Sequence, residues 1–373
     1  MIEGLGTLLE GTKATGLCEL RVLLAEVLGG EDVEGCLLEQ IRLSRQRVFR
    51  LRFQLEGRVR SLIVKRLSPE RALSERTAIT RWLPRAGFGR HAVPLVGVAS
   101  QRDGDSTWHV YEDLGGPTLR QAAHEPRNVR AAVEVIAAHH TRFVGHPLLA
   151  ECRLIGVDLG TGFYATCVED ALRGLDAMLR LDSVHGERRE LVQRLRQRLT
   201  RLWDERHERT RELVDLAWPE TLQHGDLWAT NVLVLLGESG PDVRLIDWDH
   251  AGVGPAVYDV STLLRQFPRP ERPWMLEAYR ASVESAGWTW PAPAAWNRLA
   301  ETAELARYAN TIVWRTIVAT QDHPAAPPDW IFEDLAETET WFDNLTPLLP
   351  TGDELMHQEY RPGDGMTTEA KAF

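Results

Sequence analysis

The sequence lacks the features that mark several protein classes. It has four cysteines, and no two of them show the CxxC spacing of a zinc or redox site. It contains no run of about 18 apolar residues, and no basic segment leads into an apolar stretch near the N-terminus. We therefore expect reduced thiols, no disulfide framework, no zinc knuckle and no membrane span, in a cytoplasmic protein.

Positive charge is also scarce relative to negative charge. The chain has 43 lysines and arginines against 54 aspartates and glutamates, which gives a formal net charge of -11. An acidic surface repels nucleic acid and anionic lipid unless basic residues gather locally. The arginine-rich segment 188–211 is interleaved with acidic residues, so it predicts an ion-paired, solvated helix face. We expect no nucleic-acid or membrane partner, whereas a neutral or cationic partner is compatible with this charge.

The apolar pattern divides the 373 residues into a β-rich first third and a helical remainder. Helical spacing predicts a helix over 18–28, and alternation predicts a small antiparallel sheet with strands near 48–53, 62–64, 93–99 and 108–112. After Gly115-Gly116-Pro117, amphipathic patterns predict helices at 129–143, 165–180, 188–213, 272–285, 294–320 and 330–348. One β-rich island, at 221–248, interrupts these helices.

This division predicts an α+β protein with two lobes. We expect an N-terminal lobe at 1–112, of which 1–37 form a helical extension, and a mostly helical C-terminal lobe at 113–350. The segment from 351 to 373 is polar and has no periodicity, so it predicts a flexible tail. Ligand sites commonly form where two such lobes meet, so the junction near 111–116 is of interest.

The densest group of chemically useful residues lies within the β-rich island. Val232–Leu236 and Val243–Ile246 are apolar and flank turn-forming residues, which predicts a hairpin. The residue midway in sequence between Asn231 and Asp247 lies in that turn, so these two residues are expected to face each other at the open end of the hairpin. Asp226 lies just upstream, on the loop that leads into the first strand. An amide oxygen, a carboxylate and nucleotide phosphates together suit Mg²⁺, which keeps several waters and needs few protein ligands.

The same spacing, H-x-D-x-x-x-x-N followed by a hairpin and a second aspartate, occurs in the kinase catalytic loop. The chain here resembles the aminoglycoside phosphotransferase and choline kinase superfamily, through His224-Gly225-Asp226-Leu227 with Asn231, Ile246-Asp247-Trp248-Asp249, and Gly254-Pro255 with Asp259-Val260. The resemblance implies a two-lobed protein-kinase-like fold and transfer of the γ-phosphate of ATP or GTP to a small-molecule hydroxyl. It implies Asp226 as catalytic base, Asn231 and Asp247 as Mg²⁺ ligands, and His224 as a brace for the loop.

A second group of residues, upstream, points to nucleotide binding. Lys65 ends an apolar strand, and the helix predicted after Ser68-Pro69-Glu70 places Glu75 as the one acid on the stripe of Ala72, Ile79 and Trp82. A charge on an apolar face is costly unless it is paired, so Lys65 is its expected partner. In kinases such a pair positions the α and β phosphates. Tyr111, Glu112 and Leu114 resemble the inter-lobe hinge whose backbone would hydrogen-bond the base.

The sequence also departs from the kinase pattern and leaves alternatives open. The nucleotide-covering turn 43–49 contains no glycine, so phosphate binding there would fall to Arg45 or Arg47. A pseudokinase that binds nucleotide and acts as an interaction module is one alternative. A metal-dependent hydrolase that uses His224, Asp226, Asp247, Asp249 and His250 is another.

The sequence also leaves the identity of the phosphate acceptor open. The resemblance is compatible with aminoglycosides, other antibiotics, amino sugars, choline, ethanolamine and homoserine-like metabolites. Acidic residues at 333–343 favour a cationic one.

Overall fold

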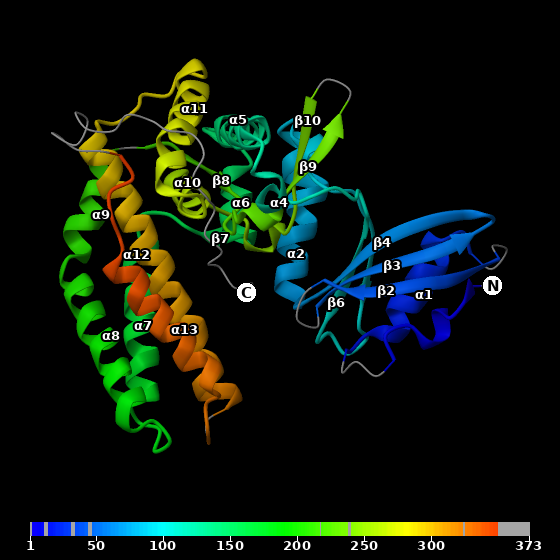
Figure 1. Ribbon diagram of the computed structural model, residues 1–373, viewed down its shortest axis with the longest axis horizontal. Helices are drawn as coiled ribbons and strands as arrows, with labels where there is room; N and C mark the ends of the chain where they lie inside the picture. Colours follow the sequence, from blue (N-terminus) through cyan, green and yellow to red (C-terminus); the bar gives the residue numbers. More distant parts are fainter. Residues whose placement is uncertain are drawn as a thin grey trace. The chain divides into compact units, whose positions relative to one another are not determined.

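The computed structural model describes residues 2–10, 14–30, 34–43, 47–216, 218–237, 240–323 and 325–349 (Figure 1). The chain forms two compact units. The first runs to Val157 and includes His224–Gly252, and the second consists of Asp158–Gln223 and the chain from Val253 onward. The predicted α+β class is confirmed, with an N-terminal sheet and a largely helical remainder. The tail predicted from 351 lies outside the described residues, and the lobe boundary at 112 and 113 stays a prediction.

The first unit is built on a sheet of six strands in the order β1-β2-β3-β4-β6-β5. The short β1 pairs with β2 in parallel, and every other neighbouring pair is antiparallel. Glu56 and Gly57 form the two-residue turn between β3 and β4, and both have positive φ angles, as a tight hairpin requires. The strands span Ile2–Glu3, Gly35–Arg42, Val48–Leu55, Arg58–Leu67, Leu95–Ser100 and Thr107–Glu112, from β1 to β6.

One face of this sheet is closed by the N-terminal extension. The segment 1–37 was predicted to be helical, but Ile2–Glu3 and the start of Gly35–Arg42 are strands of the sheet itself. Helix α1 (Leu17–Val27) and the chain before it lie against the sheet (Figure 1), and Leu20 and Leu24 have no exposed surface. Within β4, Leu62 and Val64 are buried in this layer, so the alternation of a strand directs Lys65 to the opposite face. The extension therefore forms a hydrophobic layer behind the strand that carries Lys65.

We expect Leu24→Ala to lower the free energy of unfolding by about 2 to 5 kcal/mol, because it removes a buried side chain and leaves a cavity. Val22→Ala, on the same helix, is the matched control, since Val22 is 61% exposed and its loss is expected to cost under about 0.5 kcal/mol. Urea denaturation measures both. Equal effects would show that α1 does not contribute to the core.

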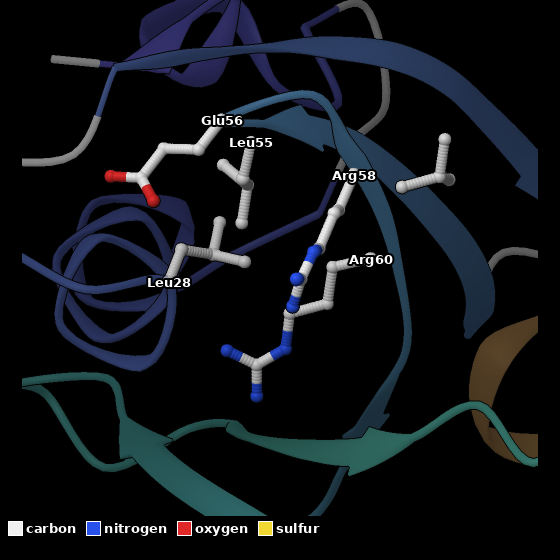
Figure 2. A pocket seen from close by; sticks show the side chains of 6 residues that line it. Leu28, Leu55, Glu56, Arg58 and Arg60 are labelled. Atoms are coloured by element: carbon white, nitrogen blue, oxygen red, sulfur yellow. The ribbon is translucent and has the colours of Figure 1, made fainter.

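A depression of about 550 Å³ lies where the C-terminal end of α1 meets the β3–β4 turn (Figure 2). Arg60, which lines it, donates to Val27 O at 2.5 Å and to Glu112 Oε1 at 3.0 Å. One side chain therefore joins the last turn of α1 to the end of β6. The other lining residues are Leu28, Leu55, Glu56, Arg58 and Val59.

The rest of the first unit holds the helix of Glu75 and the predicted hairpin. Helix α2 (Pro69–Thr77) continues through a π-helical turn, Ala78–Trp82, into α3 (Leu83–Arg85), and the stripe predicted from sequence is buried. The hairpin consists of β9 (Val232–Gly237) and β10 (Gly240–Leu245), with Glu238 and Ser239 outside the described residues. Helices α4 and α5 contact it. The remaining helices are α4 (Leu119–Ala122), α5 (Pro126–Phe143) and α6 (Leu149–Ile155).

The second unit is mostly helical, and α7, α8, α12 and α13 lie side by side in it (Figure 1). Two sequence predictions need correction. The single helix predicted at 188–213 is two helices that meet at Glu205, and the helix predicted to reach 348 ends at Asp343. The helices span Phe163–Met178, Gly186–Asp204, Arg206–Asp215, Val257–Arg265, Arg272–Ser285, Pro293–Ile317 and Asp329–Asp343, from α7 to α13. A small sheet joins β7 (Val157–Asp158), β11 (Gly252–Pro255) and β8 (Glu220–Gln223).

Ion pairs join the helices of the second unit, and arginines of the segment 188–211 pair with acids of another helix as well as with the interleaved ones that the sequence predicted. Arg194 forms two hydrogen bonds of 2.9 Å with Glu339, and Arg198 pairs with Asp343. Glu339 and Asp343 belong to the acidic segment 333–343, from which we predicted a preference for a cationic acceptor. Because arginines of the protein already neutralise them, they give no support to that preference. Within the described residues, no helix is both long and apolar enough to cross a membrane.

Candidate active site

Lys65 and Glu75 form a buried ion pair between β4 and α2. The Lys65 Nζ atom lies 3.1 Å from each carboxylate oxygen of Glu75. The Glu75 side chain is 1% exposed, so its charge is removed from water and depends on protein donors. The structure thus brings together the two residues that the sequence predicted as partners.

The hairpin places Asp247, one of the two predicted metal ligands, next to this pair. Ile246 N donates to Asn231 O at 3.0 Å, so the residues at the open end of the hairpin are adjacent, although Asn231 lies opposite Ile246 and not Asp247. Asp247 has a φ of 70°, and this left-handed conformation turns the chain away from the strand direction. The Asp247 carboxylate contacts Lys65 Nζ directly.

Asp226 lies on the loop that leads into the hairpin. The side chain of Asn231 holds Asp226 in place by hydrogen bonds. The Asn231 Nδ2 atom donates to Asp226 O at 2.9 Å and to Asp226 Oδ2 at 3.1 Å. Because the amide nitrogen is committed to these acceptors, the Asn231 Oδ1 oxygen remains as a ligand atom. The geometry therefore places an amide oxygen beside the carboxylate predicted to be the base.

His224 braces this loop through both ring nitrogens. Its Nε2 atom lies 2.8 Å from Ile246 O, and Asp226 N donates to Nδ1 at 3.4 Å. A carbonyl accepts and an amide donates, so the ring is held as the neutral tautomer that carries its proton on Nε2. Gly225, between the two, has a φ of 79°, and a Cβ there would lie 2.0 Å from His250 O. A glycine is therefore required at this position.

The hydrolase alternative conflicts with this geometry. The ring nitrogens of His224 are both occupied by the backbone, and His250 Nε2 faces Arg71. Among the described residues, no group of three or more histidine, cysteine or acidic side chains is arranged to hold a metal. The oxygens of Asn231 and Asp247 remain, and they fit a hard cation that also uses phosphate and water.

The sequence did not predict that Asp249, Arg71 and His109 lie beside the Lys65–Glu75 pair. Asp249 Oδ2 lies 3.5 Å from Lys65 Nζ and 3.4 Å from Arg71 Nη1 on α2. His109 on β6 lies 3.4 Å from Glu75. The β4–β6 pairing places His109 directly opposite Lys65, and this register could not be read from sequence because β5 intervenes between the two strands in the chain.

The hinge residues predicted from sequence lie at the end of β6. Glu112 N donates to Pro94 O at 3.1 Å, and Asp113 N to Ser61 O at 3.4 Å. Within the described residues, no hydrogen bond engages the Leu114 N–H. The roles of Tyr111, Glu112 and Leu114 in base binding stay predictions. The turn that would cover the nucleotide includes residues 44–46, so Arg45 lies outside the described residues.

Comparison with known proteins decides the family. The sequence model of the phosphotransferase enzyme family matches residues 40–296, which is more than half of the chain. The chain belongs to this family. The predicted membership of a phosphotransferase family is therefore confirmed, and so is the enzyme class, a phosphotransferase. No curated protein sequence matches the chain.

Solved structures share the fold of this phosphotransferase. The GDP complex of an aminoglycoside 2'-phosphotransferase is 13% identical, covers 89% of this chain and 99% of its own, and has a TM-score of 0.57. The ethanolamine kinase of Plasmodium vivax is 12% identical, with coverages of 84% and 82% and a TM-score of 0.56. A spectinomycin phosphotransferase in complex with ADP and spectinomycin is 13% identical, with coverages of 83% and 90% and a TM-score of 0.51. These likenesses confirm the protein-kinase-like fold.

The carboxyl groups of the phosphotransferase site differ in their protonation. Burial raises the pKa of Asp226 to about 7, and the nearby negative charge of Asp247 adds to the rise. Burial alone would raise the pKa of Asp247 too, but the Lys65 ammonium holds that pKa at about 2. Burial and the Asp247 charge also raise the pKa of Asp249 to about 7. At neutral pH Asp247 is therefore ionised, and Asp226 is divided between its two forms.

We expect the Asp226 carboxyl to titrate near pH 7 in the metal-free protein, as followed by carbon-13 NMR of labelled aspartate. Asp247→Asn removes the like charge, so the midpoint should move to lower pH. Asp242→Asn is the matched control, because Asp242 pairs with Arg244 on the same hairpin and should leave the midpoint unchanged. A midpoint in the ordinary aspartate range, near pH 4, would contradict this electrostatic description.

Proposed function

We propose that the protein is a Mg²⁺-dependent kinase that transfers the γ-phosphate of ATP or GTP to a hydroxyl of a small molecule. The observation that carries the proposal is the position of Lys65, whose ammonium contacts both Glu75 and Asp247. A lysine held between a helix and the hairpin aspartate is placed to bind nucleotide phosphates beside a metal ion. The bound GDP and ADP in similar structures support a nucleotide co-substrate.

In this proposal the nucleotide is bound by β4 and the end of β6. Lys65 binds the phosphates, and Glu75 keeps the lysine extended toward them. The unengaged Leu114 N–H is a donor for the base, in the hinge segment that Tyr111 and Glu112 begin. A Mg²⁺ ion would be held by the Asn231 and Asp247 oxygens, and when bound it neutralises charge on the phosphates.

Asp226 serves as the catalytic base. Its carboxylate is held by Asn231 and has a pKa near neutrality, so in its ionised form it accepts a proton from an acceptor hydroxyl at physiological pH. The oxygen that loses the proton attacks the γ-phosphorus, and the nucleoside diphosphate leaves. Asp247 stays ionised throughout, because its pKa is about 2.

The acceptor belongs to the range used by similar enzymes, which includes spectinomycin, other aminoglycosides, ethanolamine and choline. An assay of ADP or GDP release over a panel of such alcohols identifies it. Acceptor-dependent release with one of them supports the kinase. Nucleotide binding without release for any acceptor would favour the interaction module.

We expect Mg²⁺ with ATP or GTP at millimolar concentration to raise the melting temperature, because a ligand that binds only the folded state stabilises it by mass action. At a nucleotide concentration of about 100 times Kd the gain is about 2.7 kcal/mol. Differential scanning fluorimetry with and without Mg²⁺ measures the shift, and Lys65→Ala should reduce it. No shift with either nucleotide would count against the proposed kinase.

Asp226→Asn and Asp247→Asn should have different kinetic effects. Asp226→Asn removes the base, so kcat should fall about 10²- to 10⁴-fold while nucleotide affinity changes little. Asp247→Asn weakens metal binding, so nucleotide affinity and kcat should both fall, and added Mg²⁺ should restore part of the activity. Steady-state kinetics over a Mg²⁺ series separates the two.

Asp242→Asn provides the control for the chemical change itself, since Asp242 lies on β10 and pairs with Arg244 away from the site. It should keep kcat and nucleotide affinity near those of the unsubstituted enzyme. Turnover within a few-fold of normal in Asp226→Asn would exclude Asp226 as the base.

A further inference from the structure

Two residues of β6 lie beside the Lys65–Glu75 pair: His109 contacts the Glu75 carboxylate, and Tyr111 contacts His109. The His109 Nδ1 atom lies 3.4 Å from Glu75 Oε2 and 2.9 Å from the Tyr111 hydroxyl. His109 has no exposed surface, and Tyr111 is 7% exposed. The strand register accounts for their placement, because His109 pairs with Lys65 and Tyr111 with Ile63, on the face that α2 covers.

Glu75 needs more donors than Lys65 alone supplies. The Lys65 ammonium is also in contact with Asp247, and Asp249 lies 3.5 Å from it. These three carboxylates compete for one cation, whereas Glu75 is the most deeply buried of them and has least access to water. A buried carboxylate has lost its hydration, and a cation that it shares with two other carboxylates compensates for only part of that loss, so additional hydrogen bonds must hold it.

The surroundings of His109 fix which ring nitrogen carries the proton. Within the described residues, its Nε2 atom is buried and has no hydrogen-bond partner. A proton on Nε2 would leave a buried donor unsatisfied, whereas a proton on Nδ1 is directed at Glu75 and the Tyr111 oxygen. Burial and the Glu75 charge raise the pKa of Tyr111, so its hydroxyl keeps its proton, and its oxygen lies 2.9 Å from His109 Nδ1.

We propose that His109 and Tyr111 are positioning residues: His109 holds the Glu75 carboxylate in place by donating a hydrogen bond to it, and Tyr111 orients the His109 ring, so that Lys65 stays directed at the nucleotide phosphates. The inference rests on the proposed kinase function. Neither residue touches the reacting atoms through its side chain. Both act through Glu75, and this dependence makes the proposal testable.

A double-mutant cycle tests the dependence. His109→Leu and Tyr111→Phe should each lower kcat/KM for the nucleotide about tenfold, with little change in the KM of the acceptor. The same substitutions made in a Glu75→Gln background should add less than a twofold loss, because the carboxylate through which they act is gone. His109→Asn, which retains an N–H near the position of Nδ1, should keep most of the activity that His109→Leu loses.

Val110→Ala is the matched control on the same strand. Val110 is fully buried but lies on the other face of the sheet, in the core that the N-terminal extension covers. Its substitution should lower stability, and any loss of kcat/KM should combine additively with that of Glu75→Gln. The proposal would be overturned if the loss in kcat/KM caused by His109→Leu were also additive with that of Glu75→Gln. It would also be overturned if His109→Leu and Tyr111→Phe both kept the kcat/KM of the unsubstituted enzyme.

Nitrogen-15 NMR of the unsubstituted protein gives a second readout that needs no activity. Histidine-labelled protein should show His109 protonated on Nδ1 and unprotonated on Nε2, and Glu75→Gln should perturb the Nδ1 signal. A proton on Nε2 alone would overturn the proposal even in an active enzyme. Absence of phosphoryl transfer from any nucleotide, with the expected tautomer, would instead reject the kinase function and leave the contact between His109 and Glu75 intact.

Discussion

The Lys65 ammonium is the charge on which the site depends. It lies within ion-pair distance of Glu75, Asp247 and Asp249, which come from α2 and from the segment after the hairpin. Without the cation, three carboxylates would face each other in a poorly solvated region, and their mutual repulsion would favour protonation or separation. The carboxylates in turn raise the pKa of Lys65 despite its burial, so it remains charged. One lysine thereby joins a strand, a helix and the predicted metal loop.

The two faces of the N-terminal sheet have different functions, because one packs in the core and the other carries residues of the site. One face is hydrophobic and packs against α1, while the other presents Lys65 and His109 to α2. Successive side chains of a strand point to opposite faces of the sheet, so Val64 packs in the hydrophobic core while its neighbour Lys65 faces the site. A change in register by one residue would exchange them, placing the charges in the apolar layer. The packing of the N-terminal extension therefore fixes the orientation of the site residues as well as stabilising the sheet.

The loop that carries Asp226 is held mainly by contacts to backbone. His224 spans from Asp226 N to Ile246 O, and Asn231 returns to both the backbone and the side chain of Asp226. The direct approach of Gly225 to the His250 carbonyl leaves no space for a side chain. Because the protein itself makes these contacts, the carboxylate is preorganised, and less free energy is lost in orienting it during catalysis.

The sequence by itself determined the strands around Lys65, the buried stripe of α2 and the hairpin, because each follows from a short periodicity or a local spacing. It also indicated the Lys65–Glu75 pair, since an isolated acid on an apolar face requires a partner. It did not determine the break at Glu205, where local helical periodicity continues although two helices form. Only the tertiary structure placed His109 beside Glu75, and Asp249 beside Arg71 and Lys65. These contacts join strands and helices far apart in the chain, and strand register and helix packing, which no local pattern encodes, decide them.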